Sequence, residues 1–283
     1  MIERKLCGDV PLTALPPGSI DTHVHLLHDG YPAVAGGPGL PPAPLPTPDM
    51  YRQLMAWLGI DRLVITQANA HQTDNSCLLH CLREMGDIAR GVAVITAETS
   101  TAEIAELSDA GVVGARIMDL PGGAVGLDAL EDIDALCADA GLMMAVQFDG
   151  SALPQLESRL ARLQSRWVLD QHGKIFCGAN QEHIDSLKRL LDQGEMWFKF
   201  AGCYESSREG APYADIAKVA REIANYAPDR IVWGSNWPHN LAKTTADYPD
   251  DGELMDTVLA WLPDDDVTRY KALVTNPVEL YGF

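Results

Sequence analysis

Residues 21–25 read Asp-Thr-His-Val-His and close an apolar run that begins at Ser19. Much later in the chain, residues 234–239 read Gly-Ser-Asn-Trp-Pro-His and close a second such run. Both runs are rich in residues that favour β-strands. Because side chains alternate along a strand, His23 and His25 share one face and could hold a common ligand. The two segments therefore predict two strands that carry polar groups at their carboxyl ends.

Short β-rich runs alternate with helical runs along the whole chain. The predicted strands are Ser19–Leu26, Arg62–Gln67, Gly91–Ile95, Val113–Ile117, Leu142–Phe148, Trp167–Asp170, Met196–Phe200 and Arg230–Gly234. The predicted helices are Asp49–Leu58, Asn75–Ala89, Thr101–Asp109, Leu127–Ala138, Ala152–Leu160, Asn180–Leu191, Tyr213–Tyr226 and Glu253–Leu262. A short extra helix is expected within residues 276–283.

Strict alternation of this kind predicts a parallel sheet, because parallel strands need crossover connections. Eight strand–helix pairs within about 250 residues are typical of a closed (β/α)₈ TIM barrel. An open doubly wound sheet would normally carry a glycine-rich phosphate turn after its first strand, and none follows residues 21–25. We therefore predict an α/β protein with a single barrel domain over residues 1–283.

Composition limits the possible partners. The 283 residues carry a formal net charge of −19, which repels nucleic acid and anionic membrane surfaces. No run approaches the roughly 20 apolar residues that span a bilayer. The first eighteen residues lack the apolar run of a secretory signal, so a cytoplasmic location is expected. The scattered cysteines predict free thiols without a zinc site of their own.

The segment Tyr31–Pro48 is dense in proline and glycine, which exclude it from the interior of a helix or strand. A disordered linker is one interpretation. The segment interrupts a barrel and does not join two domains, so a long ordered loop is the stronger prediction. Such a loop would lie over the mouth of the barrel and could act as a lid.

Active sites of barrels lie at the carboxyl ends of the strands. The polar residues expected at these ends are His23, His25, Asn69, His71, Arg116, Asp119, Gln147, Asp149, His172, Lys174, Lys199, Tyr204, Glu205, Arg208, Asn236 and His239. Only His80 and His183 fall in predicted helices, and His28 belongs to a turn. Individually, Arg116 could merely pair with Asp119, and Lys199 could be a satisfied barrel lysine. Their joint occurrence at one end of the barrel predicts an active site.

The His23/His25 pair, the Asp-Gln-His-Gly sequence at 170–173 and the segment 234–239 resemble the amidohydrolase superfamily, in its branch of metal-independent lactonases. Segments 36–42, 115–125, 197–202 and 204–208 carry the same resemblance, which extends over nearly the whole chain. It implies a barrel enzyme that converts D-galactaro-1,5-lactone into the 1,4-lactone in D-galacturonate catabolism. The alternative is hydrolysis of a sugar-acid or pyrone lactone; a decarboxylase or a binding module is a more distant possibility.

A metal-dependent member would need a bridging Lys or Glu on strand four, His on strands five and six, and Asp on strand eight. This chain has Arg116, Gln147 and Asn236 at three of those places. We therefore expect no catalytic metal and no other cofactor. The alternative is one zinc ion bound by His23, His25 and His172.

Isomerisation of a lactone needs no water, because the substrate's own 4-hydroxyl can attack the C1 carbonyl. Asn236 cannot accept a proton as the family's strand-eight Asp does, which favours this route over hydrolysis. Our hypothesis is that His172, or in second place His25, moves the proton from the 4-hydroxyl to the leaving O5.

The remaining expected roles concern a small anionic sugar lactone. Its carboxylate would be held by Arg116, Lys174 and Arg208. Its carbonyl oxygen would accept a hydrogen bond from His23, His71 or Asn236. The expected substrate-binding set is completed by Gln147, Tyr204 and His239.

Overall fold

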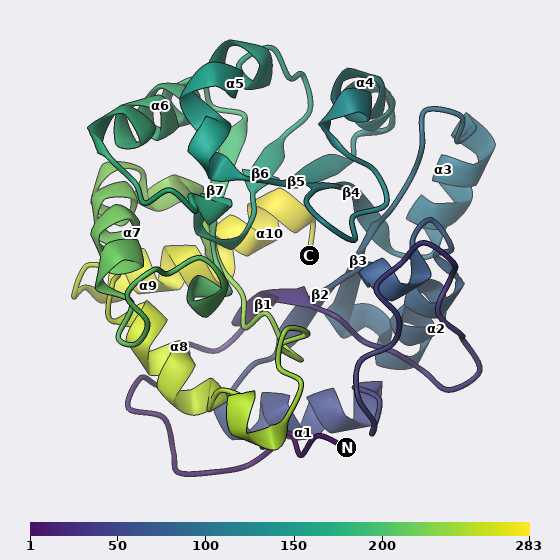
Figure 1. The fold of residues 1–283 in the computed structure, drawn as a ribbon, viewed down its shortest axis with the longest axis horizontal. Coiled ribbons are helices and arrows are strands. Elements are labelled where there is room, and N and C mark those ends of the chain that lie inside the picture. The colour runs from purple at the N-terminus through teal and green to yellow at the C-terminus, as the bar shows by residue number, and fades with distance from the viewer.

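The structure, a computed structural model, describes residues 1–283 and contains one sheet of eight parallel strands in the order β1 to β8. The strands are β1 (Ile20–Val24), β2 (Arg62–Thr66), β3 (Ala89–Ala93), β4 (Val112–Asp119), β5 (Met143–Phe148), β6 (Trp167–Leu169), β7 (Met196–Phe200) and β8 (Ile231–Trp233). Every predicted strand is present, and no bound differs by more than two residues. The predicted (β/α)₈ barrel is confirmed (Figure 1).

The barrel closes between β1 and β8 through a few hydrogen bonds. The Thr22 hydroxyl donates to the carbonyl of Trp233 at 2.8 Å, and the amide of His25 donates to the carbonyl of Trp237 at 2.9 Å. One of these hydrogen bonds starts within β1, and the other starts just after it. Together they bring the segment after β8 directly beside His23 and His25.

Most of the helices form a ring around the strands, whereas the last helix lies within this ring in the view of Figure 1. Their bounds are α1 (Pro48–Leu58), α2 (Ser76–Met85), α3 (Thr101–Asp109), α4 (Leu130–Ala140), α5 (Leu153–Leu160), α6 (Gln181–Asp192), α7 (Ala214–Tyr226), α8 (Asp251–Leu259), α9 (Asp266–Tyr270) and α10 (Asn276–Tyr281). Local sequence explains several starts: Thr47 caps α1 ahead of Pro48, and Ser100 forms a capping box with Glu103 at α3. No helix has the length and apolar character needed to cross a bilayer.

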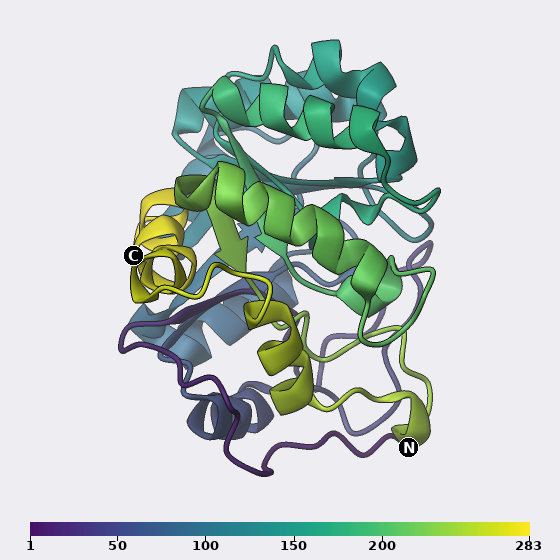
Figure 2. The ribbon, with the colours of Figure 1, turned by 90° about the vertical axis from the view of Figure 1, so that its left-hand side faces the viewer.

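At the amino ends of the strands, the barrel interior is filled by apolar side chains from alternate strand positions. This layer comprises Ile20, Val64, Val92, Met143, Ala145, Val168, Trp197 and Val232, together with Leu280 and Tyr281 of α10. The predicted C-terminal helix therefore covers the end of the barrel that lies at the amino ends of the strands. It lies at one side of the molecule in Figure 2, so the opposite end is left for the site.

The proline-rich segment contains no helix or strand before α1 and is held to its surroundings by hydrogen bonds. The amide of Val34 donates to the carbonyl of Ala70, and the amide of Leu27 donates to the carbonyl of Pro46. On its outer side, Arg4 donates to the carbonyl of Pro42 at 3.3 Å. The predicted long ordered loop is confirmed.

Candidate active site at the mouth of the barrel

A continuous set of hydrogen bonds crosses the mouth of the barrel. The Arg116 guanidinium donates to Asn69 Oδ1 at 2.8 Å and to Gln147 Oε1 at 3.1 Å. Gln147 donates to Gln171, and Gln171 donates to Asn236 Oδ1 at 2.5 Å. Arg116 and Gln147 lie in β4 and β5, and the other three residues follow β2, β6 and β8, so one network connects five strands at this end of the barrel. We call this set the polar belt.

The polar belt continues from Asn236 to the segment after β7. Asn236 Nδ2 donates to the Tyr204 hydroxyl at 2.7 Å and to Glu205 Oε1 at 2.9 Å. Glu205 is also paired with the buried ammonium of Lys174. Both ends of the Asn236 side chain are therefore engaged, and its amide orientation is determined by its neighbours.

The Tyr204 hydroxyl is held by a hydrogen-bonded pair, His239 and Asp251. The Tyr204 hydroxyl is 2.6 Å from His239 Nδ1, and His239 Nε2 is 2.8 Å from Asp251 Oδ1. Because a carboxylate only accepts, the His239 proton lies on Nε2, and Nδ1 accepts from the tyrosine. Burial and the nearby Glu205 carboxylate raise the pKa of Tyr204 well above its ordinary value, so it stays a neutral donor.

Below the polar belt lies a fully buried ion pair between two inward-facing residues. Lys199 Nζ is 2.7 Å from Asp170 Oδ1, and neither side chain is exposed. Burial alone would raise the pKa of Asp170, but attraction to the Lys199 ammonium lowers it below its ordinary value. Burial alone would lower the pKa of Lys199, yet Asp170 raises it. Both groups are therefore charged at neutral pH.

The histidine pair of β1 stands next to this ion pair. His23 Nδ1 lies 3.4 Å from Lys199 Nζ, and His23 Nε2 lies 3.3 Å from His25 Nε2. His25 Nδ1 lies 2.8 Å from the carbonyl oxygen of Thr66, which can only accept. The His25 proton is therefore on Nδ1, and its Nε2 is an acceptor that faces His23. The two imidazoles therefore lie together on one face of β1, as the alternation of side chains along a strand predicts.

Burial keeps both imidazoles neutral. It lowers the pKa of His23, although the Asp170 charge partly opposes this change. It lowers the pKa of His25 well below its ordinary value, and the neighbouring His23 acts in the same direction. A neutral His25 can accept a proton, and once protonated it is a strong acid that returns the proton readily.

His172 does not join this group, so the expectation that it faces the mouth is wrong. Its ring stacks on Phe200 at a centroid distance of 5.1 Å and packs edge-on against Trp261. Neither ring nitrogen has a hydrogen-bond partner, and burial lowers the pKa of His172 to about 3. Phe200 belongs to the outward face of β7, since the neighbouring Lys199 points inward. His172 therefore lies between the barrel wall and the helices.

The reason is a left-handed turn after β6. Residues 171–174 have φ values of 49°, 55°, 73° and 45°, whereas a strand would alternate its side chains at φ near −120°. The turn directs Gln171 into the polar belt and His172 to the outer side. Non-glycine residues in this region carry backbone strain of about 1–3 kcal/mol each, a feature that clusters at functional sites.

The alternative zinc ligand set of His23, His25 and His172 is not assembled, because His172 is turned away. The two remaining imidazoles have the Lys199 ammonium beside them, and strand eight supplies the neutral amide of Asn236. Two nitrogens next to a buried cation do not make the three- or four-ligand site that zinc needs. The residues present therefore do not fit a catalytic metal.

Two other predicted residues have different surroundings from those expected. Arg208 is exposed and donates to the carbonyl of Cys177 at 2.6 Å, away from the polar belt. His71 is buried, but its Nε2 lies 3.1 Å from the carbonyl of Tyr31. His71 thus holds the start of the proline-rich loop. The remaining predicted binding residues, Arg116, Gln147, Lys174, Tyr204 and His239, are all in or next to the polar belt.

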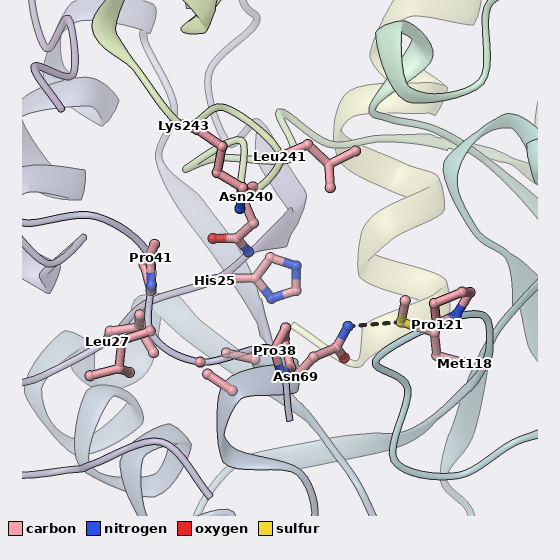
Figure 3. Close-up of a pocket in the computed structure, with 14 residues that line it drawn as sticks. His25, Leu27, Pro38, Pro41, Asn69, Met118, Pro121, Asn240, Leu241 and Lys243 are labelled. Carbon is pink, nitrogen blue, oxygen red and sulfur yellow. Dashed lines mark hydrogen bonds between the residues drawn. The ribbon is translucent and has the colours of Figure 1, made fainter. Parts of the chain in front are cut away.

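A cavity of about 180 Å³ opens above His25. Its walls come from the proline-rich loop (Pro38 to Pro41), from the segment after β2 and from the segment after β8. Figure 3 shows the His25 imidazole facing this space between Asn240 and Asn69. The predicted placement of the proline-rich loop over the mouth is therefore confirmed. Lys243 also lines the cavity and was not predicted.

Several participating residues escaped sequence reasoning. Asp170 and Gln171 lie inside the segment that carries the family resemblance, so both had a signal that could have been used. Asp251 begins α8, and Lys243 lies in an irregular connection. No periodicity or motif marks either of these last two residues.

Two cations at the site have no carboxylate partner. Arg116 donates only to neutral oxygens of Gln67, Asn69 and Gln147, and Lys243 donates to the carbonyl of Asn240. Lys174 and Lys199, in contrast, are paired with carboxylates. In a chain with a net charge of −19, such unpaired cations make the mouth a local place for an anion.

Comparison with known proteins places the chain among relatives of similar architecture. D-galactarolactone isomerase of Agrobacterium fabrum is 53% identical over 280 residues, which cover 98% of this chain and 96% of that protein. 4-sulfomuconolactone hydrolase of Rhizobium radiobacter is 31% identical and covers 95% and 91%. A ligand-free crystal structure of an Agrobacterium tumefaciens protein superposes with a TM-score of 0.97 at 52% identity and covers 99% of both chains.

The family model described as "Amidohydrolase" matches residues 20–283. This span begins at β1 and includes every strand end that contributes to the polar belt and the buried histidine pair. The protein therefore belongs to this amidohydrolase family, as its strand-end residues had indicated.

Proposed function

We propose that this protein is a lactone isomerase that converts D-galactaro-1,5-lactone into D-galactaro-1,4-lactone in D-galacturonate catabolism. The substrate would be a small anionic sugar lactone bound in the cavity above His25. Its carboxylate would be drawn to Lys243, a cation that lines the cavity and lacks a carboxylate partner. The relative that is 53% identical over nearly the whole chain bears the isomerase name.

The observation that carries the proposal is that the residue after strand eight, Asn236, is an amide whose oxygen and nitrogen are both hydrogen-bonded. Asn236 accepts from Gln171 and donates to Tyr204 and Glu205. An amide in this position cannot take a proton from water, so a hydrolase would lack its usual base here. An internal hydroxyl of the substrate, held at high effective concentration, needs much less activation.

The reaction is an intramolecular acyl transfer. The 4-hydroxyl attacks C1, a tetrahedral oxyanion forms, and the bond from C1 to O5 breaks as O5 takes the proton. We assign the proton transfer to His25, whose Nε2 would accept the proton of the 4-hydroxyl in place of its 3.3 Å contact with His23, because His25 is neutral and lines the cavity. The buried Arg116 cation would stabilise the oxyanion electrostatically. The earlier hypothesis for His172 as the base is withdrawn, since its ring packs on Phe200.

We further propose that the reaction proceeds without a metal. The support is chemical: Lys199 lies 3.4 Å from His23, which opposes a second cation at the histidine pair. No step of the proposed acyl transfer needs a Lewis acid, because positive charge is already present in Arg116 and Lys199.

A lactone hydrolase is the second candidate, and one observation favours it. Glu205 is a carboxylate 2.9 Å from Asn236 Nδ2 and could serve as a base for water. Its ion pair with Lys174 weighs against this role, because Lys174 and Asn236 already occupy the two carboxylate oxygens that would have to bind water.

The product distinguishes the two candidates. Chelator-treated enzyme is mixed with freshly prepared D-galactaro-1,5-lactone and followed by proton NMR, with a pH indicator in parallel. An isomerase accumulates the 1,4-lactone and releases no acid, whereas a hydrolase forms galactarate and releases one proton per turnover. Activity that returns only when zinc is added would overturn the metal-free proposal.

A further inference from the structure

We propose that His28, His80 and Glu84 form a binding site for a divalent transition metal, which ties the start of the proline-rich loop to α2. We call these three residues the outer cluster. His28 follows β1, whereas His80 and Glu84 lie one turn apart on α2. One possible ligand atom from each residue lies within 4.8 Å of the others. None of the three belongs to the polar belt or to the cavity above His25.

The two imidazoles of the outer cluster are already held in place by oxygen atoms. His28 Nδ1 lies 2.6 Å from the carbonyl of Asp29, and His80 Nδ1 lies 3.2 Å from the Tyr31 hydroxyl. A carbonyl oxygen only accepts, so the His28 proton is on Nδ1 and its Nε2 is a free electron-pair donor. Metal-binding histidines usually have their other ring nitrogen fixed in this way.

The carboxylate of the outer cluster is oriented from its other side. Arg52 Nη1 lies 3.5 Å from Glu84 Oε1, while Glu84 Oε2 lies 3.7 Å from His80 Nε2. Arg52 also donates to the main-chain carbonyl of Glu84 at 2.7 Å. The oxygen that faces His80 is thus the one left for a ligand.

The distances fit a site that a metal would draw together. With metal–nitrogen bonds of about 2.0–2.1 Å, neighbouring ligand atoms in a tetrahedral site lie roughly 3.3 Å apart. The possible ligand atoms of the outer cluster lie within 4.8 Å of one another, and both imidazoles are half-buried, so side-chain rotations can bring these atoms to that spacing. Two imidazoles and one carboxylate are a ligand set for zinc and similar divalent ions, with water in the remaining position.

The location of the outer cluster gives the metal a structural consequence. Tyr31 contacts His80 through its hydroxyl and His71 through its carbonyl. It is also the first residue of the proline-rich loop, which lines the cavity from Pro38 to Pro41. A metal that fixes His28 and His80 would therefore fix the base of this loop relative to α2.

The experiment uses zinc and cobalt(II) as probes on the full-length protein. Zinc binding is measured by isothermal titration calorimetry after chelator treatment, and cobalt(II) is followed through the visible absorption of its low-coordinate complexes. We expect a single equivalent in the wild type, and loss of this binding by at least tenfold in His80→Gln and in Glu84→Gln. Asp87→Asn, which removes an exposed carboxylate three residues after Glu84, is the matched control and should bind as the wild type does.

Limited proteolysis tests the link to the proline-rich loop. Zinc should slow cleavage within residues 31–47 in the wild type and in Asp87→Asn, but not in His80→Gln. The proposal of a site is overturned if the wild type binds no zinc, or if His80→Gln and Glu84→Gln bind it unchanged. Zinc binding with no change in cleavage would overturn the tether. These readouts do not depend on the lactone reaction, so their failure is separate from a failure of the proposed function.

Discussion

His25 is the residue of the site that is buried, oriented by a hydrogen bond and open to the cavity. The Thr66 carbonyl holds its proton on Nδ1, burial keeps it neutral, and its ring faces the cavity. His172 is equally buried but has none of these connections, because its ring nitrogens meet only apolar surroundings. Two histidines of similar sequence appearance thus have opposite environments, and only one is suited to move a proton.

Replacement of His25 by Gln should reduce kcat by about 10²–10⁴-fold, the usual contribution of a positioned acid–base group. KM should change little, since glutamine keeps a polar side chain of similar size. Steady-state kinetics on the 1,5-lactone measure both values. His172→Phe is the comparison variant and should keep kcat within about threefold of the wild type, because it preserves the contact with Phe200. The opposite ranking of the two variants would return the base to His172.

At the scale of elements, the buried pair of Asp170 and Lys199 joins the end of β6 to β7 and meets His23 of β1. Both members are inaccessible to solvent. A buried ion pair of this kind is weak support for overall stability, but removal of one partner leaves an uncompensated charge. The pair thus determines where the strand ends lie more than how strongly the barrel is folded.

Lys199→Met should therefore lower the free energy of unfolding by about 3–5 kcal/mol, because Asp170 would remain charged and unpaired. Urea unfolding followed by circular dichroism provides the value. Lys188→Met removes a lysine from the surface pair with Glu222 and should leave the unfolding midpoint almost unchanged. Equal effects of the two replacements would show that the Asp170–Lys199 pair contributes no more than a surface pair.

The connection after β8 adds the other cation of the cavity. Lys243 is exposed and bound only to the carbonyl of Asn240, so its ammonium can turn to a bound carboxylate. Lys243→Met should raise KM about tenfold, equivalent to ~1.4 kcal/mol, with kcat nearly unchanged. Lys218→Met, at an exposed position of α7, is the control. An unchanged KM in Lys243→Met would remove Lys243 from substrate binding.

At the scale of the whole molecule, three buried neutral histidines make stability depend on pH. Burial lowers the pKa of His23, His25 and His172, the last from 6.5 to about 3. The unfolded chain therefore binds more protons than the folded protein below pH 6.5. The stability that this difference contributes is complete above pH 6.5 and is lost as the pH falls toward 3.

Urea unfolding at pH 7 and pH 5 should show a loss of a few kcal/mol, since each such histidine contributes up to ~1.4 kcal/mol per pH unit below 6.5. Asp170 does not add to this interval, because its lowered pKa lies below 3.8 and its contribution is lost only in stronger acid. His172→Phe should show a smaller loss than the wild type. Identical losses in the two proteins would mean that His172 is already accessible to protons in the folded state.

The amino-acid sequence by itself determined the barrel, the end at which its polar groups gather and the pairing of His23 with His25. These features follow from local periodicity: apolar strands of regular spacing must pair in parallel, and a period of two places alternate residues on one face. The loop over the mouth was equally predictable, because proline and glycine exclude regular structure.

Only the tertiary structure decided the inner arrangement of the site. The turn at residues 171–174 reverses the expected directions of Gln171 and His172, and no periodicity predicts a run of left-handed residues. Asp251 and Lys243 reach the site from distant connections. Such positions depend on which surfaces remain free once the strands have closed, and this is settled by packing across the whole barrel and not by neighbours in the chain.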